Sequence, residues 1–255
     1  MFEPFDLTNK VALVTGGNGG IGLGMARGLA AAGASVAIWG RDVRKNADAV
    51  EALRQYHTRI ASFSCDVTDE EDVVGAFGAT AERFGAIDSC FANAGTAPAR
   101  TPFQDTPLDE WRRIVDVNLF GTVHVLQEMI RHLRTRDAAG SVVVTSSIVG
   151  LGGAAGWEHY AATKAALLAV VRSLAVGYGR YGITVNAVLP GWVDTALTSE
   201  ALASEEYTRR VLSRQPIRRW GRPDDLAGIA VYLASDASVW HTGDAIVIDG
   251  GYTKF

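Results

Sequence analysis

Short apolar runs alternate with longer amphipathic stretches along almost the whole chain. Runs rich in β-branched and aromatic residues are typical of strands, and stretches with apolar residues at helical spacing are typical of helices. The predicted strands are Val11–Thr15, Ser35–Trp39, Ile60–Ser64, Ile87–Ala92, Ser141–Ser146, Thr184–Leu189 and Ala245–Asp249. The predicted helices are Gly20–Ala32, Arg44–His57, Asp69–Phe84, Pro107–Arg136, Tyr160–Tyr181 and Arg222–Leu233. This alternation predicts βαβ units, and therefore an α/β fold with a parallel sheet.

Several predicted strands are apolar on consecutive residues, as in the VVVTS segment that starts at Val142. A strand with this pattern is covered on both faces, whereas a strand with one wet face would alternate. We therefore expect a doubly wound sheet of seven or so parallel strands with helices on both faces. No Pro- or Ser-rich linker divides the chain, so residues 1–255 are expected to form one domain.

Composition and charge narrow the class of protein. The 255 residues carry 24 basic and 28 acidic side chains, which argues against a nucleic-acid-binding protein. Two cysteines, Cys65 and Cys90, are too few for a secreted disulfide scaffold. The N-terminal segment lacks the features of a signal peptide, and no apolar run reaches the roughly 18 residues of a membrane span. A cytoplasmic protein without a membrane partner is the expectation.

The glycine-rich segment TGGNGGIG follows the first predicted strand and opens the first predicted helix. Glycine tolerates positive φ and lets a ligand approach the backbone, and a helix N-terminus presents free N–H groups to an anion. This context favours a phosphate cradle over the alternative, a tight turn without a ligand. The residues of the cradle would be Gly16, Asn18, Gly20, Ile21 and Gly22.

The glycine spacing is TGxxxGxG rather than GxGxxG, and here the chain resembles the short-chain dehydrogenase/reductase family. Other motifs spread over nearly the whole chain support this resemblance. They are NAG at Asn93–Gly95, VNLFG with Asn118, SS at Ser146–Ser147, YAATK at Tyr160–Lys164, LPGWVDT at Leu189–Thr195 and the C-terminal DAIVIDGG. The resemblance implies a Rossmann-type fold, a nicotinamide coenzyme, a small carbonyl or alcohol substrate and a homo-oligomer, expected to be a tetramer.

The coenzyme preference depends on the end of the second strand, where the adenosine ribose would lie. An acidic residue there favours NAD, but the family's acidic position falls on Gly40, and Arg41 follows it. An Arg without that carboxylate suits a 2′-phosphate, so we expect NADP(H) to be preferred, with NAD(H) possible. The glycine loop has no basic residue, which weakens this expectation. The alternative for Arg41 is a solvated charge paired with Asp42.

Further coenzyme contacts are implied by the resemblance alone. Asp66 and Val67 would meet the adenine edge, and the loop after the fourth strand would back the adenosine ribose. The segment after the sixth strand would contact the carboxamide and the phosphates. The residues of these two segments are Asn93, Ala94, Gly95, Pro190, Gly191, Val193 and Thr195.

Tyr160 and Lys164 are four residues apart, so a helix places them on one face. A Tyr phenol has a pKa near ~10, and we expect the neighbouring ammonium to lower it, so that the phenol exchanges a proton with a reacting oxygen. Ser147 would donate a hydrogen bond to that oxygen. By resemblance, Tyr160 and Lys164 also bind the coenzyme, and Asn118 anchors a water between Lys164 and solvent.

The substrate stays open between sugars, 3-oxoacyl groups, steroid-like rings and simple ketones. Residues 150–159 and 196–220 flank the expected site, and Trp157 and Trp192 are the candidate substrate contacts. The histidines have no metal-ligand spacing, so no metal is expected. Two alternatives remain, an NAD(H)-dependent sugar or alcohol dehydrogenase and a dinucleotide-sensing protein without turnover.

Overall fold

The computed structural model describes residues 3–254, and its centre is a sheet of seven parallel strands. The strands are β1 (Val11–Thr15), β2 (Ser35–Gly40), β3 (Ile60–Ser64), β4 (Ser89–Ala92), β5 (Gly140–Thr145), β6 (Ile183–Pro190) and β7 (Ala245–Ile248). The bounds of every strand lie within two residues of the predicted run. The predicted fold class is therefore confirmed.

The order of the strands places a crevice at the centre of the sheet. The order is β3-β2-β1-β4-β5-β6-β7, so the chain leaves β1 first toward one edge and then toward the other. Doubly wound folds bind their ligands where the order reverses, at the carboxyl ends of the strands. Thr15 ties β1 to β4 at this point, because its hydroxyl accepts hydrogen bonds from the N–H groups of Asn93 and Ala94 at 3.0 Å each.

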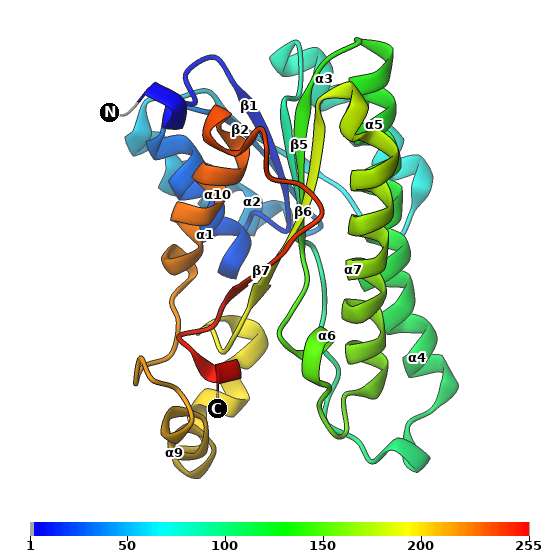
Figure 1. Ribbon diagram of the computed structural model, residues 1–255, viewed down its shortest axis with the longest axis vertical. Helices are drawn as coiled ribbons and strands as arrows, with labels where there is room; N and C mark the ends of the chain where they lie inside the picture. The colour runs from blue at the N-terminus through cyan, green and yellow to red at the C-terminus, as the bar shows by residue number, and fades with distance from the viewer. Residues whose placement is uncertain (1–2, 255) are drawn as a thin grey trace.

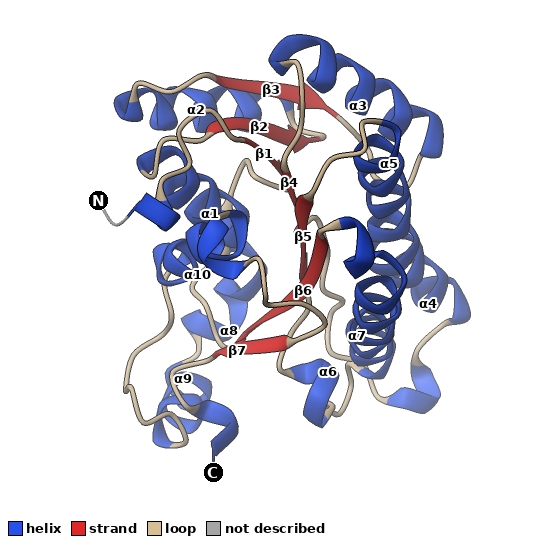
Figure 2. Cartoon of the chain, turned by 45° about the horizontal axis from the view of Figure 1, so that its top comes forward, coloured by secondary structure: helices blue, strands red, loops and turns tan. Residues whose placement is uncertain are grey.

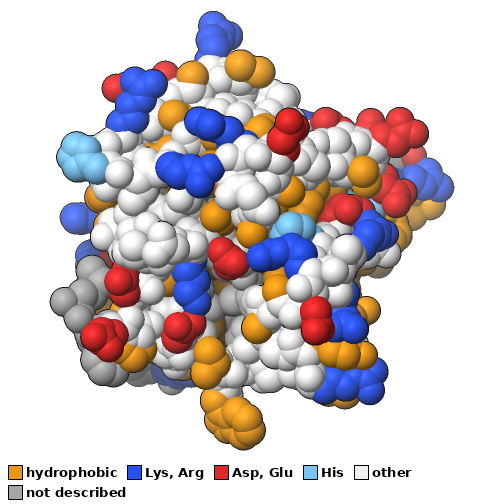
Figure 3. All heavy atoms as spheres, turned by 90° about the horizontal axis from the view of Figure 1, so that it is seen from above, with side chains coloured by type: hydrophobic (Ala, Val, Ile, Leu, Met, Phe, Trp, Pro, Cys, Tyr) orange, Lys and Arg blue, Asp and Glu red, His pale blue; other side chains and the backbone are white. Residues whose placement is uncertain are grey.

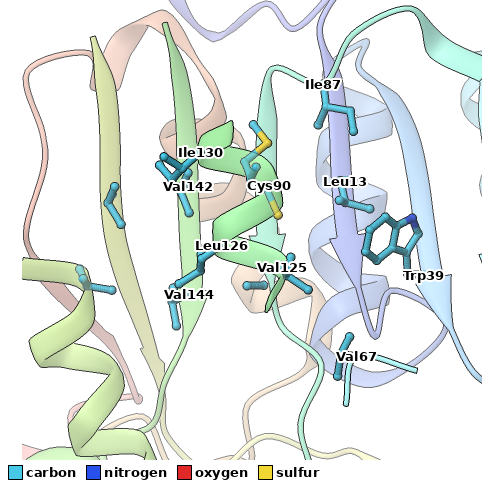
Figure 4. Packing of buried hydrophobic residues seen from close by; sticks show 14 of the residues in the cluster. Leu13, Trp39, Val67, Ile87, Cys90, Val125, Leu126, Ile130, Val142 and Val144 are labelled. Atoms are coloured by element: carbon cyan, nitrogen blue, oxygen red, sulfur yellow. The ribbon is translucent and has the colours of Figure 1, made fainter. Parts of the chain in front are cut away.

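Helices cover both faces of the sheet (Figures 1 and 2). On one face lie α1 (Gly20–Ala31), α2 (Val43–Leu53) and α10 (Ala227–Ala234). On the other lie α3 (Glu70–Phe84), α5 (Gly121–Thr135) and α7 (Glu158–Tyr178), with α4 (Leu108–Val115) packed against α7. A separate apolar cluster fills the space on each face, and Figure 4 shows α5 side chains such as Leu126 above β4 and β5.

The segment predicted to flank the substrate lies beyond the carboxyl ends of the strands. Residues 196–220 form a 3₁₀ turn at Ala196–Thr198, then α8 (Ser199–Ala203), α9 (Glu205–Ser213) and an irregular stretch. The short helix α6 (Val149–Gly152) follows β5 at the same end of the molecule (Figure 1). Both flanking segments of the expected site therefore lie where the crevice opens.

The predicted helical stretch Pro107–Arg136 is helical throughout Leu108–Thr135, but it is not one regular α-helix. A π-helical segment, Asp116–Phe120, separates α4 from α5. Asn118 explains this local change, because its side chain bonds both backbone groups of Thr96 and is held toward the sheet. A π-helical segment inside an α-helix often marks a functional site. The periodic pattern of apolar residues cannot reveal it, since it shifts the helix by a single residue.

The helical stretch Glu158–Tyr181 is long and apolar enough, by length and composition only, to cross a membrane. Its mean hydropathy is 1.3, but one such helix is weak evidence for a span. Lys164 lies within it and is buried, and α7 packs along β6. Only 33% of its most apolar window is buried, so much of an apolar helix faces outward.

The end of the molecule away from α6 and α9 carries acidic and basic side chains side by side (Figure 3). That arrangement accords with the small formal net charge of −4. No large region of one sign is visible on this face, so it offers no basic platform for a polyanion.

Candidate active site

A cavity of about 850 Å³ opens at the carboxyl ends of the central strands. Most of the predicted site residues line it, although they come from distant parts of the chain. They are Gly16, Asn18, Gly20, Ile21, Arg41, Asp66, Val67, Asn93, Ala94, Gly95, Ser147, Tyr160, Lys164, Pro190, Gly191, Val193 and Thr195. Four predicted residues, Gly22, Asn118, Trp157 and Trp192, do not line this cavity.

The glycine loop is shaped by close backbone approaches. Gly16 and Gly20 have φ values of +63° and +49°, which other residues rarely adopt. A Cβ at Gly22 would come within 2.3 Å of the Gly16 carbonyl oxygen, so this glycine permits the turn to pack on α1 rather than to touch a ligand. A side chain at Gly19 would meet no atom within 4 Å. The loop therefore leaves open space above the start of α1.

The start of α1 suits an anion. Its N-cap is Gly19, no side chain caps it, and its first turn holds no acidic residue. The free N–H groups and the positive end of the helix dipole are therefore available to a phosphate. On the opposite wall, the Thr145 hydroxyl is buried and has no hydrogen-bond partner within residues 3–254. The cradle, the volume and this unpaired hydroxyl fit a nicotinamide dinucleotide.

The adenosine end of the cavity lacks the carboxylate that favours NAD, and two asparagine side chains lie over the glycine at that position. A Cβ at Gly40 would lie 2.2 Å from the Asn18 side-chain nitrogen and 2.6 Å from the Asn46 side-chain oxygen. Asn18 donates to Asn46 at 2.7 Å, and Asn46 in turn donates to the Gly40 carbonyl at 2.8 Å. This network lies over Gly40, so a larger residue there would have to displace the Asn18 and Asn46 side chains.

Two basic residues stand beside this network. Arg41 is exposed and donates to Asp66 at 3.4 Å. The alternative pairing with Asp42 does not form in the described part of the chain, because Asp42 caps α2 by accepting from the N–H groups of Arg44 and Lys45. The side chain of Lys45 also lines the cavity. Sequence reasoning missed Lys45, although its position in the first turn of α2, four residues after Arg41, could have revealed it.

The three residues of the predicted catalytic set meet at the other end of the cavity. Ser147 follows β5, and Tyr160 and Lys164 lie one turn apart on α7. Lys164 donates to the Thr145 carbonyl at 2.9 Å, and its Nζ lies 5.6 Å from the centre of the Tyr160 ring. The Ser146 hydroxyl donates to the Lys164 carbonyl at 2.8 Å and so fixes α7 against β5.

Burial controls the pKa values of both catalytic groups on α7. It raises the pKa of Tyr160 to about 12, against the opposing effect of the hydrogen bond with Ser147. It lowers the pKa of Lys164 to about 8. The expected lowering of the Tyr160 pKa is therefore not found in the protein alone, because the loss of water raises this pKa more than the Ser147 hydrogen bond lowers it. At neutral pH Tyr160 is protonated and is a proton donor.

Asn118 lies behind the cavity wall and is fully buried. It accepts from the Thr96 N–H at 2.8 Å and donates to the Thr96 carbonyl at 2.9 Å. A Cβ at Gly95 would lie 3.1 Å from the Asn118 oxygen and 3.6 Å from the Lys164 nitrogen. Asn118 therefore shapes the loop beside Lys164, and its role in holding a water stays a prediction.

The two predicted substrate contacts belong to an aromatic cluster beside Tyr160. The ring of Trp157 lies 6.1 Å from that of Tyr160 and 6.1 Å from that of Trp192. Trp192 also contacts Tyr207, Trp220 and Tyr252, at 5.4, 5.7 and 6.4 Å between ring centres. Tyr207 and Tyr252 were not predicted from the sequence. They lie before and after β7, and only the fold brings them to this cluster.

His159, next to Tyr160 in the sequence, lies outside the cavity. It is buried against Trp111 of α4, with 5.5 Å between ring centres. Neither ring nitrogen has a hydrogen-bond partner within residues 3–254. Burial lowers its pKa, so the imidazole is neutral and serves as packing between α4 and α7.

This fold and site define a class of protein, the dinucleotide-dependent oxidoreductases with a doubly wound sheet. Comparison with known proteins makes the class specific. Residues 16–253 match a protein-family model described as enoyl-(acyl carrier protein) reductase. The chain is 40% identical to a cis-4-hydroxycyclohexanecarboxylate dehydrogenase from Sinomonas cyclohexanicum, over 96% of each chain. It is 36% identical to an L-rhamnose 1-dehydrogenase (NAD(P)(+)) from Azotobacter vinelandii, over 96% of this chain and 97% of the relative.

Solved structures agree with these relatives. A gluconate 5-dehydrogenase from Burkholderia cenocepacia, in complex with NADP and tartrate, superposes with a TM-score of 0.94 at 33% identity, covering 99% of this chain and 98% of that one. The chain belongs to the short-chain dehydrogenase/reductase family. It is an NAD(P)-dependent oxidoreductase that transfers hydride to or from an alcohol or carbonyl group.

Proposed function

We propose that the protein is an NADP(H)-preferring dehydrogenase or reductase of secondary alcohols and ketones, with Ser147, Tyr160 and Lys164 as its catalytic set. The observation that carries the proposal is that one cavity is lined both by the glycine cradle and by these three side chains. A dinucleotide in the cradle brings its reactive end to the side where Tyr160 lies.

In this mechanism the residues place and protonate the reacting oxygen. A bound nicotinamide coenzyme supplies a hydride to the carbonyl carbon, or accepts one from the alcohol carbon in the reverse direction. As the carbonyl π electrons move to oxygen, Ser147 donates a hydrogen bond to it and Tyr160 transfers its phenolic proton. Lys164, held by the Thr145 carbonyl, stabilises the charge left on the Tyr160 oxygen. In alcohol oxidation the proton moves the opposite way.

The preference for NADP(H) is supported by the two basic residues at the adenosine end. Arg41 and Lys45 line the cavity beside Gly40, a position that carries no carboxylate. A 2′-phosphate gains charge-assisted hydrogen bonds from such a pair, and an unmodified ribose does not. The relative from Burkholderia cenocepacia was solved with NADP, which supports the same preference.

The coenzyme proposal is tested by titrating the protein with NADPH and NADH side by side. We expect tighter binding of NADPH. In the Arg41→Ala variant the affinity for NADPH should fall about 10- to 100-fold, as expected for the loss of a hydrogen bond to a charged group. Binding of NADH should change far less. If Arg41→Ala keeps the full preference for NADPH over NADH, that preference belongs to Lys45. A preference for NADH in the unaltered protein would reject the proposal.

Catalysis rather than sensing is tested by Tyr160→Phe. This change removes the proton donor and little else, so turnover should fall about 10²- to 10⁴-fold while the affinity for the coenzyme is unchanged. Steady-state rates and coenzyme fluorescence titrations measure the two effects separately. Unaltered turnover would contradict the mechanism. Coenzyme binding by the unaltered protein without turnover of any alcohol or ketone would favour the dinucleotide-sensing alternative.

The substrate proposed at this level is a sugar, a cyclic alcohol or the matching ketone. The names of the relatives support this range, since they act on a hydroxycyclohexanecarboxylate and on L-rhamnose. We further propose a cytoplasmic homo-oligomer. The oligomer is supported by the outward apolar face of α7, on which Val176 is 87% exposed. The location is supported by the two cysteines, which are free and buried.

A further inference from the structure

An arginine stands on the substrate side of Tyr160 without an ion pair in the described part of the chain. Arg100 lies in the loop after β4, and its Cζ is 5.9 Å from the centre of the Trp157 ring. Its Nε donates to the Ala155 carbonyl at 2.9 Å. Within residues 3–254 its two terminal amino groups have no ion pair and no hydrogen bond. Its planar fork of donors is therefore open to a ligand.

The chain builds this position through two loops. A Cβ at Gly156, whose φ is +78°, would lie 2.7 Å from Cγ of Arg100, so the arginine stem lies directly on this glycine. The Thr101 N–H donates to the Gly156 carbonyl at 3.3 Å and joins the same two loops. With the Ala155 bond, these contacts aim the guanidinium along the face of Trp157 rather than leaving it to move freely in solvent.

The Trp157 ring lies between this cation and the catalytic phenol. Its other near neighbours are Tyr160 and Trp192, each 6.1 Å away between ring centres. The indole N–H groups of Trp157 and Trp192 are buried and have no acceptor within residues 3–254. A buried donor without an acceptor costs free energy, and an oxygen-bearing ligand would satisfy it. The wall beside Tyr160 thus offers flat apolar surface, unpaired donors and the Arg100 guanidinium, which also helps to hold the pKa of Glu158 below its usual range.

We propose that the substrate is a cyclic hydroxy or oxo carboxylic acid. Its reacting carbon lies at Ser147 and Tyr160, its ring lies against Trp157, and its carboxylate is bound by Arg100. A carboxylate matches the guanidinium fork with two parallel hydrogen bonds. A neutral sugar would form no charge-assisted pair with the guanidinium, and a long acyl chain would not use the flat wall. This inference rests on the proposed hydride transfer at Tyr160 and adds no chemical step to it.

The test compares two ketones that differ only in charge. They are 4-oxocyclohexanecarboxylate and its uncharged amide, 4-oxocyclohexanecarboxamide, each reduced with NADPH and with NADH. In Arg100→Met the stem on Gly156 is retained and the charge is lost. We expect the acid-to-amide ratio of kcat/KM to fall about 10- to 100-fold, mainly through KM of the acid, as for the loss of hydrogen bonds to a charged group. Arg100→Lys should restore part of the ratio.

Arg210→Met is the matched control, since Arg210 is an exposed cation on α9 that acts on Tyr207: burial raises the pKa of Tyr207, and the charges of Arg100 and Arg210 oppose that rise. The ratio should keep its unaltered value in this variant. A ratio near one in the unaltered protein, or an equal loss in Arg210→Met, overturns the role of Arg100 while hydride transfer stands. Coenzyme binding with turnover of other alcohols or ketones, but of neither ring, rejects the cyclic acid. Failure to turn over any alcohol or ketone instead rejects the proposed function.

Discussion

At the scale of single residues, the site keeps two ionisable groups in an environment that opposes their charged forms. Lys164 is only 4% exposed, and burial lowers its pKa from 10.5 to about 8. Burial raises the pKa of Tyr160 from 10.0 to about 12. A group held in this way costs stability, because the unfolded chain can hydrate the charge and the folded chain cannot.

This cost predicts that Lys164→Met stabilises the protein near neutral pH while it abolishes turnover. Below pH 8 the folded state must bury an ammonium, and between 8 and 10.5 the unfolded state binds more protons than the folded state. The free energy of unfolding of the unaltered protein therefore rises with pH through this window. In Lys164→Met that contribution disappears, and the gain at neutral pH should be about 1–3 kcal/mol after the lost bond to Thr145 is subtracted.

Urea unfolding of the two proteins at neutral pH and near pH ~10 measures this difference, since all other groups contribute equally to both. The gain should be largest at neutral pH and small at the higher pH. Tyr160 does not mask it, because the higher pKa of its folded form makes it act mainly above pH 10. A Lys164→Met variant that is less stable at neutral pH would show that the bond to Thr145 outweighs desolvation.

Residue identities in the site were predictable, but their environments were not. Ser147, Tyr160 and Lys164 stand in a motif whose spacing is visible in the sequence, and the structure brings all three to one cavity. The direction of the Tyr160 pKa depends on how much water reaches it, which no local pattern records. Lys45 and Arg100 were not predicted for a similar reason. The role of each depends on segments that are distant in the sequence but close in the fold.

At the scale of elements, α1 is held close to α10 by glycines spaced one turn apart. A Cβ at Gly24 would lie 2.2 Å from the Pro223 carbonyl oxygen, and one at Gly28 would lie 2.8 Å from the Ala227 Cβ. The start of α1 forms the anion cradle, so the packing of its later turns on α10 also fixes the cradle. Any side chain at these glycines must push the two helices apart.

Gly28→Ala should therefore destabilise the protein by about 1–3 kcal/mol through overpacking, and should weaken coenzyme binding as α1 shifts. Gly78→Ala is the matched control, since Gly78 is an exposed helical glycine of α3 where an added Cβ would meet no atom within 4 Å. This second change should stabilise the protein by about 0.5–1 kcal/mol through helix propensity. Thermal unfolding of both variants checks the opposite signs. Equal effects would mean that α1 moves freely against α10.

The elements themselves were predicted well where the periodicity is strong, as in the seven strands. The differences are local, and they lie where a side chain or a turn overrides the helical period. Asn118 imposes the π-helical segment through its bonds to Thr96, and the helix predicted over Arg222–Leu233 begins instead as a 3₁₀ turn at Pro223–Leu226. In the first case the deciding contact joins residues far apart in the sequence, and in the second it depends on a single turn. The spacing of apolar residues contains neither kind of information.

At the scale of the whole molecule, the order of the strands explains how residues from both halves of the chain reach one cavity. The molecule nevertheless leaves apolar surface exposed. Trp240, before β7, is 99% exposed, and Val176 on α7 is 87% exposed. Large exposed apolar side chains on an apolar helix are typical of a surface that another protein covers. A second copy of the chain is the proposed cover, because closed homo-oligomers are the commonest assemblies of soluble proteins.

Val176→Glu would bury a charge if α7 meets a second copy, so the oligomer should dissociate into smaller species at micromolar concentration. Val43→Glu is the control, since Val43 is 67% exposed at the first turn of α2, where an acidic side chain suits the helix dipole. Light scattering during size-exclusion chromatography measures both masses. The same mass for both variants and for the unaltered protein would place any interface elsewhere, and a monomeric unaltered protein would reject the oligomer outright.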